Sequence, residues 1–496
     1  MKYRQIIILC LILILTFFIR AHFVSEAFEG DQGIYAYIGW GWEHGKILYR
    51  DLVDNKPPLA FAFYRIIFKL FGHSVEAIRL VYSLLAVLTT LALYGLARSV
   101  FKPRTALLGT FLYGLFSGGA LVVGSFPNAE NLMVFFIILA FYLFWRAYEG
   151  KGDFLFLLCG IFIGLAAMTK QSALFEGMGM SVFLYLVYPF RKSGFLGLKR
   201  IGLVWLGAGI VFSLVFAYLI SKGTLKDFVN STVLYGLFYS RAAGVTQSAV
   251  NFFRALSWTP RENFPLWVLA GLGVVLAFKK KDRVLFFLLI WLISAFLGVA
   301  ITGRFYPQYF IQAMPPLALA ATYTLEKLFW QPQASRRKKS FGVVVLALTL
   351  FVFVRAQWNY YFKYGPDESL INRRGKLVRP LMVKATAEMV AFIRERTKPD
   401  DYIYIWGFWP EIYFLSQRYS SSKYAFLASR GVMIKDFASL VKRQVLADTI
   451  KNKPVYFIID YHFAVLIDGD LGKYLEDYYY LDREIGGCRV LRRKGP

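Results

Sequence analysis

Two apolar runs decide the class of fold: IIILCLILILTFFI at residues 6–19 and FGVVVLALTLFVFV at residues 341–354. They form the middle of apolar blocks of roughly 16 to 22 residues, the length that a helix needs to cross a hydrocarbon core of about 30 Å. An unpaired backbone amide is too costly in lipid, so a spanning segment is a helix or part of a closed barrel. The blocks therefore predict a polytopic α-helical membrane protein.

Similar blocks recur along the chain. Hydrophobic residues make up 57% of the 496-residue sequence and aromatic residues 18%, more than a soluble chain of this length needs for its core. The excess has to face lipid. We expect about eleven transmembrane helices, near residues 5–21, 77–101, 105–123, 130–148, 154–169, 172–190, 201–220, 264–278, 284–301, 308–329 and 341–361.

The first span has the position of a signal peptide. Arg20, Ala21 and His22 follow it, and they make a poor cleavage site because such sites need small residues. We expect the span to remain as an uncleaved anchor.

The formal net charge of +27 is explained better by the orientation of the chain in the membrane than by a nucleic-acid binding site. Alternate connections between the spans are rich in Lys and Arg, whereas the short ones around residues 124–129, 169–171 and 302–307 carry only Lys170 and Arg304. Since basic loops stay in the cytoplasm, we expect a cytoplasmic N-terminus and an extracytoplasmic C-terminal domain. No nucleic-acid partner is expected. The basic connections hold Lys2 and Arg4; Arg98, Lys102 and Arg104; Arg146 and Lys151; Arg191, Lys192, Lys199 and Arg200; Lys279, Lys280, Lys281 and Arg283; and Arg336, Arg337, Lys338 and Lys339.

The first outer loop, residues 22–76, is too long and too patterned for a plain connector. Apolar residues recur at helical spacing in two places, which predicts two amphipathic helices lying in the membrane interface. A turn containing Lys56, Pro57 and Pro58 separates them, because a residue before proline avoids the helical region. The repeating positions are Ile34, Tyr37, Ile38 and Gly41 in the first helix, and Phe61, Tyr64, Ile67 and Phe68 in the second.

The tail has ordinary soluble character. EMVAFIRERT, PEIYFLSQR, FASLVKRQVLADTI and LGKYLEDYYY are typical of helices, and DYIYIWG and KPVYFIID are typical of strands. This alternation predicts a small α/β domain. We therefore expect a transmembrane catalytic domain at residues 1–361 and an extracytoplasmic α/β domain at residues 362–496.

Polar residues that the spans do not need gather on one predicted membrane face. Charges of both signs around one outer vestibule are a site hypothesis, because charge near a membrane core is costly. The candidates are Asp31, Asp51, Asp54 and Lys56 in the first outer loop, and Glu130, Asn131, Lys170, Gln171, Arg304, Tyr306, Gln308 and Tyr309 at the outer helix ends.

Four stretches resemble a known family. EGDQGIYAYIGWGWEHGKILYRDLVDNKPPL at residues 29–59 resembles the first extracytoplasmic loop of polyprenyl-phosphate-sugar-dependent glycosyltransferases of the GT-C fold, which include protein O-mannosyltransferases and aminoarabinose transferases. MTKQSAL at 168–174, GRFYPQYFIQAMPPLALA at 303–320 and YIYIWGFWPEIYFLSQRYSSSKY at 402–424 are further similarities. The first stretch is the most specific, since it combines an acid, an aromatic helix and a Lys-Pro-Pro turn.

The resemblance implies transfer of a sugar from an undecaprenyl- or dolichyl-phosphate carrier to an extracytoplasmic protein, lipid or glycan, with inversion. By resemblance, Asp31 is the general base that takes the acceptor proton. Lys56 and Arg304 are candidates to offset the charge of the leaving phosphate. The remaining substrate-binding candidates are Lys170, Tyr306, Glu130 and Asp54.

Each of these residues could instead have a purely structural role, without contact to a substrate. Asp31 could cap a helix beginning at Gln32, and Lys56 could pin the turn to lipid phosphates. Arg304 and Lys170 could snorkel from the ends of their spans. Glu130 could cap the fourth span, and Asp54 could shape its loop.

The sequence does not decide whether the site binds a divalent cation. Several members of the family carry an adjacent acidic pair where this chain has Asp31 and Gln32, and Gln offers no anionic ligand. A divalent cation therefore stays an open question and no other cofactor is expected. His44 stands as a single histidine in its stretch, from which we expect no metal site.

A transporter or flippase of polyprenyl-linked saccharides is the alternative function. It would need two related halves with broken helices and polar sites at the membrane midplane. The sequence contains no such repeat, and its candidate polar residues lie at one surface.

Overall fold

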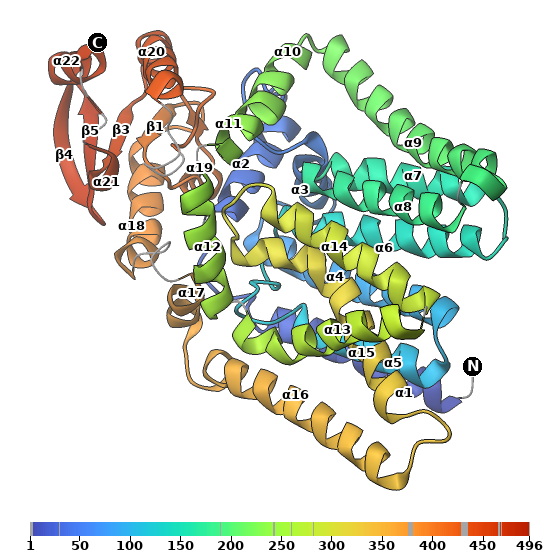
Figure 1. The fold of residues 1–496 in the computed structure, drawn as a ribbon. Helices are drawn as coiled ribbons and strands as arrows, with labels where there is room; N and C mark the ends of the chain where they lie inside the picture. The colour runs from blue at the N-terminus through green and yellow to red at the C-terminus, as the bar shows by residue number, and fades with distance from the viewer. Residues whose placement is uncertain are drawn as a thin grey trace. The chain divides into compact units, whose positions relative to one another are not determined.

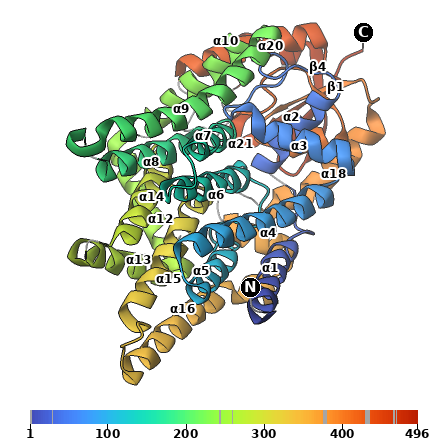
Figure 2. The same ribbon diagram turned by 90° about the vertical axis from the view of Figure 1, so that its right-hand side faces the viewer.

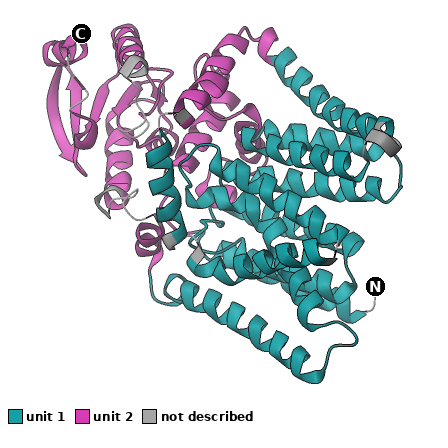
Figure 3. Ribbon diagram, in the orientation of Figure 1, with its two compact units in different colours: residues 1–24, 79–218, 243–364 teal, residues 25–78, 219–242, 365–496 magenta. Residues whose placement is uncertain are grey.

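The computed structural model describes residues 3–28, 30–188, 190–241, 244–258, 260–280, 282–374, 380–427, 435–464, 467 and 469–495. The chain forms two compact units, coloured separately in Figure 3. Unit 1 comprises residues 1–24, 79–218 and 243–364, and unit 2 comprises residues 25–78, 219–242 and 365–496. The first outer loop and the C-terminal region therefore belong to the same unit.

Unit 1 is built of helices (Figure 1). Its core is rich in stacked aromatic rings, such as Phe141 on Trp291 with their centroids 3.9 Å apart. The helices associated with it are α1 (Tyr3–Ala21), α4 (Val75–Val100), α5 (Pro103–Phe116), α6 (Ala129–Tyr148), α7 (Phe154–Ala167), η1 (Gln171–Ala173), α8 (Leu174–Val187), α9 (Phe190–Ser221), α12 (Gly244–Trp258), α13 (Pro260–Lys280), α14 (Arg283–Ala300), η3 (Pro307–Ala313), α15 (Met314–Phe329) and α16 (Arg336–Phe362).

Each predicted span overlaps a helix. Among the described residues, seven helices are long and apolar enough to cross a membrane, namely α1, α4, α6, α9, α13, α14 and α16. The other four predicted spans coincide with the shorter helices α5, α7, α8 and α15. The predicted fold class, a polytopic helical membrane protein, is confirmed, and the protein is a multi-pass membrane protein.

The first outer loop, in unit 2, contains the two helices that its periodicity predicts. They are α2 (Asp31–Glu43) and α3 (Pro58–Phe71), which pack side by side (Figure 2). Prolines 57 and 58 place the start of α3, because Pro58 occupies its first position, where no backbone N–H is needed. Every residue of α2 from Gln32 to Gly41 is buried, so this helix is covered on all its faces.

A second connection in unit 2 has an irregular helical course. It consists of α10 (Leu225–Phe228), a π-helical turn (Val229–Leu234) and α11 (Tyr235–Arg241). A π-helical turn is rare and frequently lies at a functional site.

The C-terminal region is the predicted small α/β fold. In the part that the structure describes, five strands lie in the order β2-β1-β3-β5-β4; β1 is parallel to β2 and β3, and β5 is antiparallel to β3 and β4 (Figure 1). The elements are α17 (Pro366–Arg374), α18 (Pro380–Arg396), β1 (Tyr402–Trp406), α19 (Glu411–Ser416), β2 (Tyr419–Ser420), α20 (Lys435–Asn452), β3 (Tyr456–Asp460), α21 (Tyr461–Ala464), α22 (Gly469–Tyr478), β4 (Tyr479–Ile485) and β5 (Cys488–Arg493).

Candidate functional site

Asp31 is the first residue of α2. The cap position is Gly30, with φ 58°, and no side chain makes a capping hydrogen bond there, so the N-cap interpretation of Asp31 is wrong. The Asp31 side chain is half-buried and makes no hydrogen bond or ion pair with another described residue. The positive end of the helix dipole stabilises a carboxylate at this place. Asp31 is thus an anionic group held at a fixed position and open to a ligand.

Close packing within unit 2 fixes the helix that carries Asp31. A Cβ atom on Gly33 would lie 2.6 Å from the backbone nitrogen of Glu411, so only glycine allows α2 to approach α19 this closely. One turn later, the hydroxyl of Tyr37 accepts a hydrogen bond of 3.0 Å from the backbone N–H of Ser420. These contacts explain why the sequence alternates glycines and aromatic residues along α2.

The turn before α3 is held by its own side chains. Asp54 accepts the backbone N–H of Lys56 at 2.9 Å, and the Tyr49 hydroxyl donates to the carbonyl of Lys56 at 2.9 Å. The ammonium of Lys56 donates to Oδ1 of Asn55 at 2.7 Å. Asp54 therefore shapes the loop, as its structural interpretation predicts, and Lys56 is half-buried beside it.

Asp54 is electrostatically connected to both other candidates of this loop. Burial raises the pKa of the Asp54 carboxyl above its ordinary value, the charge of Lys56 lowers it, and the charge of Asp31 raises it. Since such effects fall off with distance, the charges of Asp31 and Lys56 both lie near enough to Asp54 to act on its carboxyl group.

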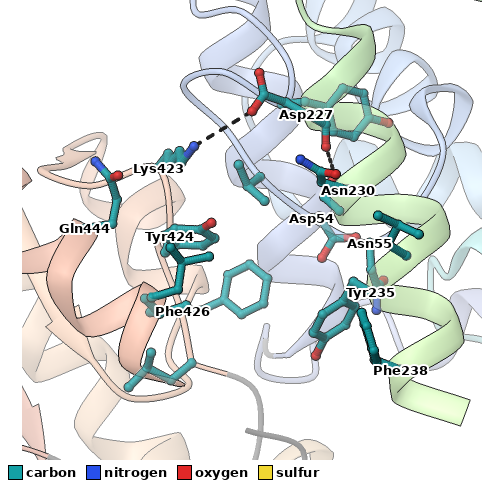
Figure 4. Close-up of a pocket in the computed structure, with 17 residues that line it drawn as sticks. Asp54, Asn55, Asp227, Asn230, Tyr235, Phe238, Lys423, Tyr424, Phe426 and Gln444 are labelled. Carbon is teal, nitrogen blue, oxygen red and sulfur yellow. Dashed lines mark hydrogen bonds and ion pairs between the residues drawn. The ribbon is translucent and has the colours of Figure 1, made fainter. Parts of the chain in front are cut away.

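A pocket of about 440 Å³ opens next to this turn within unit 2 (Figure 4). Segments far apart in the sequence form its wall: residues 49–55, residues 227–238, and residues 423–427 with residues 440–444. The wall includes Asp54, three amide side chains and several aromatic rings. The amides are Asn55, Asn230 and Gln444, and the aromatic residues are Tyr49, Tyr235, Phe238, Tyr424 and Phe426.

The pocket also contains an ion pair that sequence analysis missed. The ammonium of Lys423 lies 4.0 Å from the carboxylate of Asp227, and the two side chains point toward each other in Figure 4. No local pattern marks either residue. Asn230 lies in the π-helical turn, which is not predictable from hydrophobic periodicity, and Asp227 lies in α10 directly before it.

A second polar cluster lies in unit 1. The ammonium of Lys170 lies 2.7 Å from Oε1 of Glu130 and 3.6 Å from the centroid of the Tyr309 ring. Tyr306 packs edge-on against Tyr309 at 5.5 Å. Lys170 is 7% exposed and Glu130 3%, so each charge is largely neutralised by the other. The structure thus brings three predicted site residues together, Lys170, Glu130 and Tyr306.

A buried polar network continues from this cluster. Nε2 of Gln312 donates to both carboxylate oxygens of Glu176, at 2.8 and 2.9 Å, and the hydroxyl of Ser172 donates to Gln312 at 2.9 Å. Arg304 is half-buried in the connection between α14 and η3.

Among the described residues, no three ligand-type side chains gather around Asp31. Within the described ranges, no third His, Cys, Asp or Glu groups with Asp31 and Asp54 closely enough to share an ion. Glu29 lies outside the described residues.

The aromatic residues of the C-terminal strands pack in the interior. Trp406, Trp409 and Tyr413 are fully buried, and the indole N–H of Trp409 donates to Asp460 at 3.0 Å. These rings therefore form part of the core of the C-terminal region, where they are not accessible to a sugar.

The fold and a family match define the class of protein. Residues 55–221 match the family model of dolichyl-phosphate-mannose-protein mannosyltransferase. The whole chain has the GT-C fold of solved transferases. The predicted resemblance is confirmed to this extent: part of the chain matches a glycosyltransferase family model, and the whole chain has the GT-C fold.

Particular relatives can be named. The structure of ArnT from Cupriavidus metallidurans bound to undecaprenyl phosphate is 15% identical, with 100% of both chains covered and a TM-score of 0.66. The oligosaccharyltransferase AglB from Archaeoglobus fulgidus, in complex with an inhibitory peptide and a dolichol-phosphate, is 15% identical over 99% of this chain and 74% of that chain, with a TM-score of 0.59. An uncharacterized protein of Aquifex aeolicus (strain VF5) is 28% identical over 325 residues; the match spans 63% of this chain and 60% of that relative.

Proposed function

We propose that the protein transfers a single sugar from an undecaprenyl- or dolichyl-phosphate carrier to an acceptor outside the cytoplasm, with Asp31 as the general base. One observation carries the proposal: the Asp31 carboxylate begins a tightly packed helix, is accessible, and lies in electrostatic contact with the Asp54–Lys56 turn. A base needs a lone pair that no neighbouring donor already occupies.

The reaction is a direct displacement. Asp31 takes the proton of the acceptor hydroxyl while its oxygen forms a bond to the anomeric carbon. The bond from that carbon to the phosphate oxygen breaks, and its electron pair leaves with the polyprenyl phosphate. Because the acceptor attacks from the side opposite the leaving group, the anomeric configuration inverts.

Cationic side chains stabilise the leaving phosphate. Lys56 follows the buried Asp54 and is half-buried, so its charge is less screened than it would be in free solution. We assign Lys56 to the phosphate, while the assignment of Arg304 rests on the family resemblance alone. Each charge-assisted hydrogen bond to a developing phosphate is worth more than one to the neutral ester.

The pocket beside Asp54 has the chemistry of a saccharide site. Aromatic faces contact the apolar C–H surfaces of a sugar ring, while amides and carboxylates bind hydroxyl groups. The wall supplies both: the rings of Tyr235 and Phe238, and the amides of Asn230 and Gln444. We assign this pocket to a sugar ring of the donor or acceptor.

Glu130 and Lys170 have a structural role within unit 1. Their mutual neutralisation makes Lys170 a weaker phosphate ligand than Lys56 or Arg304. The pair instead holds Tyr309, against which Tyr306 packs, and so positions the segment that follows Arg304.

The topology follows from the same proposal. With a cytoplasmic N-terminus, the first outer loop and the α/β domain of residues 362–496 lie on the extracytoplasmic side of the cell membrane. The α/β domain helps to select the acceptor, which is a protein, a lipid or a glycan.

A transfer assay tests the base directly. Membranes containing the overproduced protein supply the acceptor, and the probes are undecaprenyl phosphates carrying radiolabelled mannose, glucose or aminoarabinose. Asp31→Asn should lower transfer about 10²- to 10⁴-fold, the usual contribution of a general base. Asp51→Asn is the matched control, because Asp51 lies in the same loop and is paired with Arg50. Wild-type transfer by Asp31→Asn would reject Asp31 as the base, and no transfer of any label by the wild type would reject these donors.

A further inference from the structure

Two of the four histidines of the chain, His44 and His73, lie close together in unit 2, although helix α3 separates them in the sequence. Glu43 is the last residue of α2 and His44 is its C-cap, while His73 lies in the connection that follows α3. One ligand atom from each of the three side chains lies within 4.8 Å of the other two. Sequence analysis considered His44 by itself; the packing of α2 against α3 supplies the second histidine.

Each imidazole is held in a defined orientation. Nδ1 of His44 lies 2.8 Å from the carbonyl oxygen of Trp40. A carbonyl oxygen only accepts, so Nδ1 carries the proton and Nε2 keeps its lone pair. Metal-binding histidines usually donate their second ring nitrogen to a carbonyl or carboxylate in this way. The ring of His44 also packs on Trp40, with centroids 5.2 Å apart.

His73 is fixed by two contacts of its own. Its Nε2 lies 2.9 Å from Oε2 of Glu43, and its ring centroid lies 5.3 Å from that of Phe68. The centroids of the His44 and His73 rings are 5.4 Å apart. The side chains of His73 and Glu43 are 28% and 23% exposed, so an ion can reach them from solvent.

These three ligands suit zinc. Zn²⁺ takes imidazole nitrogen and carboxylate oxygen at about 2.0–2.2 Å in a tetrahedron, which places neighbouring ligand atoms roughly 3.3 Å apart. The distance of 2.9 Å from Nε2 of His73 to Oε2 of Glu43 is close to that value. The ligand atom of His44 lies within 4.8 Å of the other two ligand atoms, so only small side-chain rotations would bring it into the tetrahedron. Calcium and magnesium prefer an all-oxygen shell, which two imidazoles do not provide.

We propose that Glu43, His44 and His73 form a zinc site, with water as the fourth ligand. The ion joins the C-terminal end of α2 to the connection after α3, and so fixes from its far end the helix that begins with Asp31. The proposal does not depend on the sugar-transfer reaction, because it rests on the ligands and their geometry.

Zinc content is the first test. The full-length protein is purified in detergent without a histidine tag, stripped with a chelator, dialysed against ZnCl₂ and measured by elemental analysis. We expect one zinc per chain in the wild type and its loss in the variant that combines Glu43→Gln, His44→Gln and His73→Gln. Each single substitution should weaken zinc binding at least about tenfold, since even outer contacts to a ligand change affinity by about 10- to 100-fold.

The control is His22→Gln, because His22 is exposed and packs on Tyr361 in unit 1. It should retain one zinc per chain. A second measurement needs no variant: Co²⁺ added to the stripped wild type should give the visible absorption of a tetrahedral N/O complex, which Zn²⁺ then abolishes. Zinc retained equally by the wild type and the triple variant, or a wild type that binds no zinc, would overturn the proposal and leave a simple Glu43–His73 hydrogen bond.

Discussion

Asp31 and Glu130 are both acids in the first turn of a helix, yet their surroundings differ completely. Glu130, in α6, is 3% exposed and lies 2.7 Å from the ammonium of Lys170. Asp31, in α2, is half-buried and makes no hydrogen bond or ion pair with another residue that the structure describes. The same helical position therefore supports two roles: a neutralised charge that holds helices together, and an accessible charge that is available for chemistry.

Breaking the Glu130–Lys170 pair should give the largest loss of stability. Glu130→Gln leaves the buried ammonium of Lys170 without its counter-charge, which should cost about 3–5 kcal/mol. Thermal unfolding in detergent measures the loss. Glu76→Gln is the matched control, because Glu76 is an exposed acid in the first turn of α4, and it should change stability little.

A double variant separates charge from packing. Glu130→Gln with Lys170→Met removes both charges, and it should be more stable than Glu130→Gln by itself. If the double variant were the less stable of the two, the pair would not be what holds α6 to η1.

Lys56 provides a test of the accessible site that contains Asp31. Lys56→Met should lower turnover about 10²- to 10³-fold, because one donor to the charge of the leaving phosphate is lost, with little change in unfolding temperature. Lys46→Met is the control, since the ammonium of Lys46 lies over the ring of Tyr419, 4.5 Å from its centroid. Equal rates for the two variants would remove Lys56 from the site.

The smallest effect is a dependence of stability on pH. Burial raises the pKa of Asp54, so its contribution to stability is present in acid and is lost as pH rises through that raised pKa. The stability of the wild type relative to Asp54→Asn should therefore fall as the pH rises above the ordinary pKa of an aspartate. Thermal unfolding at several pH values measures this trend.

Asp51 provides a control of opposite sign. Burial raises its pKa, but hydrogen bonds from Arg50 and from the backbone of Ile47 outweigh burial and lower it. The stability of the wild type relative to Asp51→Asn should rise with pH. Parallel trends for the two variants would contradict the assignment of these carboxyl groups.

Features encoded over short stretches are the ones that sequence predicted well. The apolar spans and the positions of α2 and α3 follow from length and periodicity. The burial of α2 on all its faces does not follow from the amphipathic pattern that the sequence predicts. Most elements of the tail agree with the prediction. The stretch LEDYYY is an exception: the pattern predicts a helix throughout, whereas α22 ends at Tyr478 and β4 begins at Tyr479.

Features assembled from distant segments could not be predicted. Asp227 and Lys423 meet in the pocket across almost two hundred positions of sequence, and His73 reaches Glu43 only through the packing of α2 and α3. Lys170 and Glu130 were both singled out, but not as partners. Pairing depends on tertiary packing, which a single sequence does not report.

The most direct test separates binding from chemistry in Asp31→Asn. Native mass spectrometry measures binding of undecaprenyl phosphate, and a single-turnover experiment with the labelled donor that the wild type uses measures the chemical step. The variant should bind the carrier as the wild type does and transfer its sugar about 10²- to 10⁴-fold more slowly. Equal single-turnover rates in the two proteins would contradict the account.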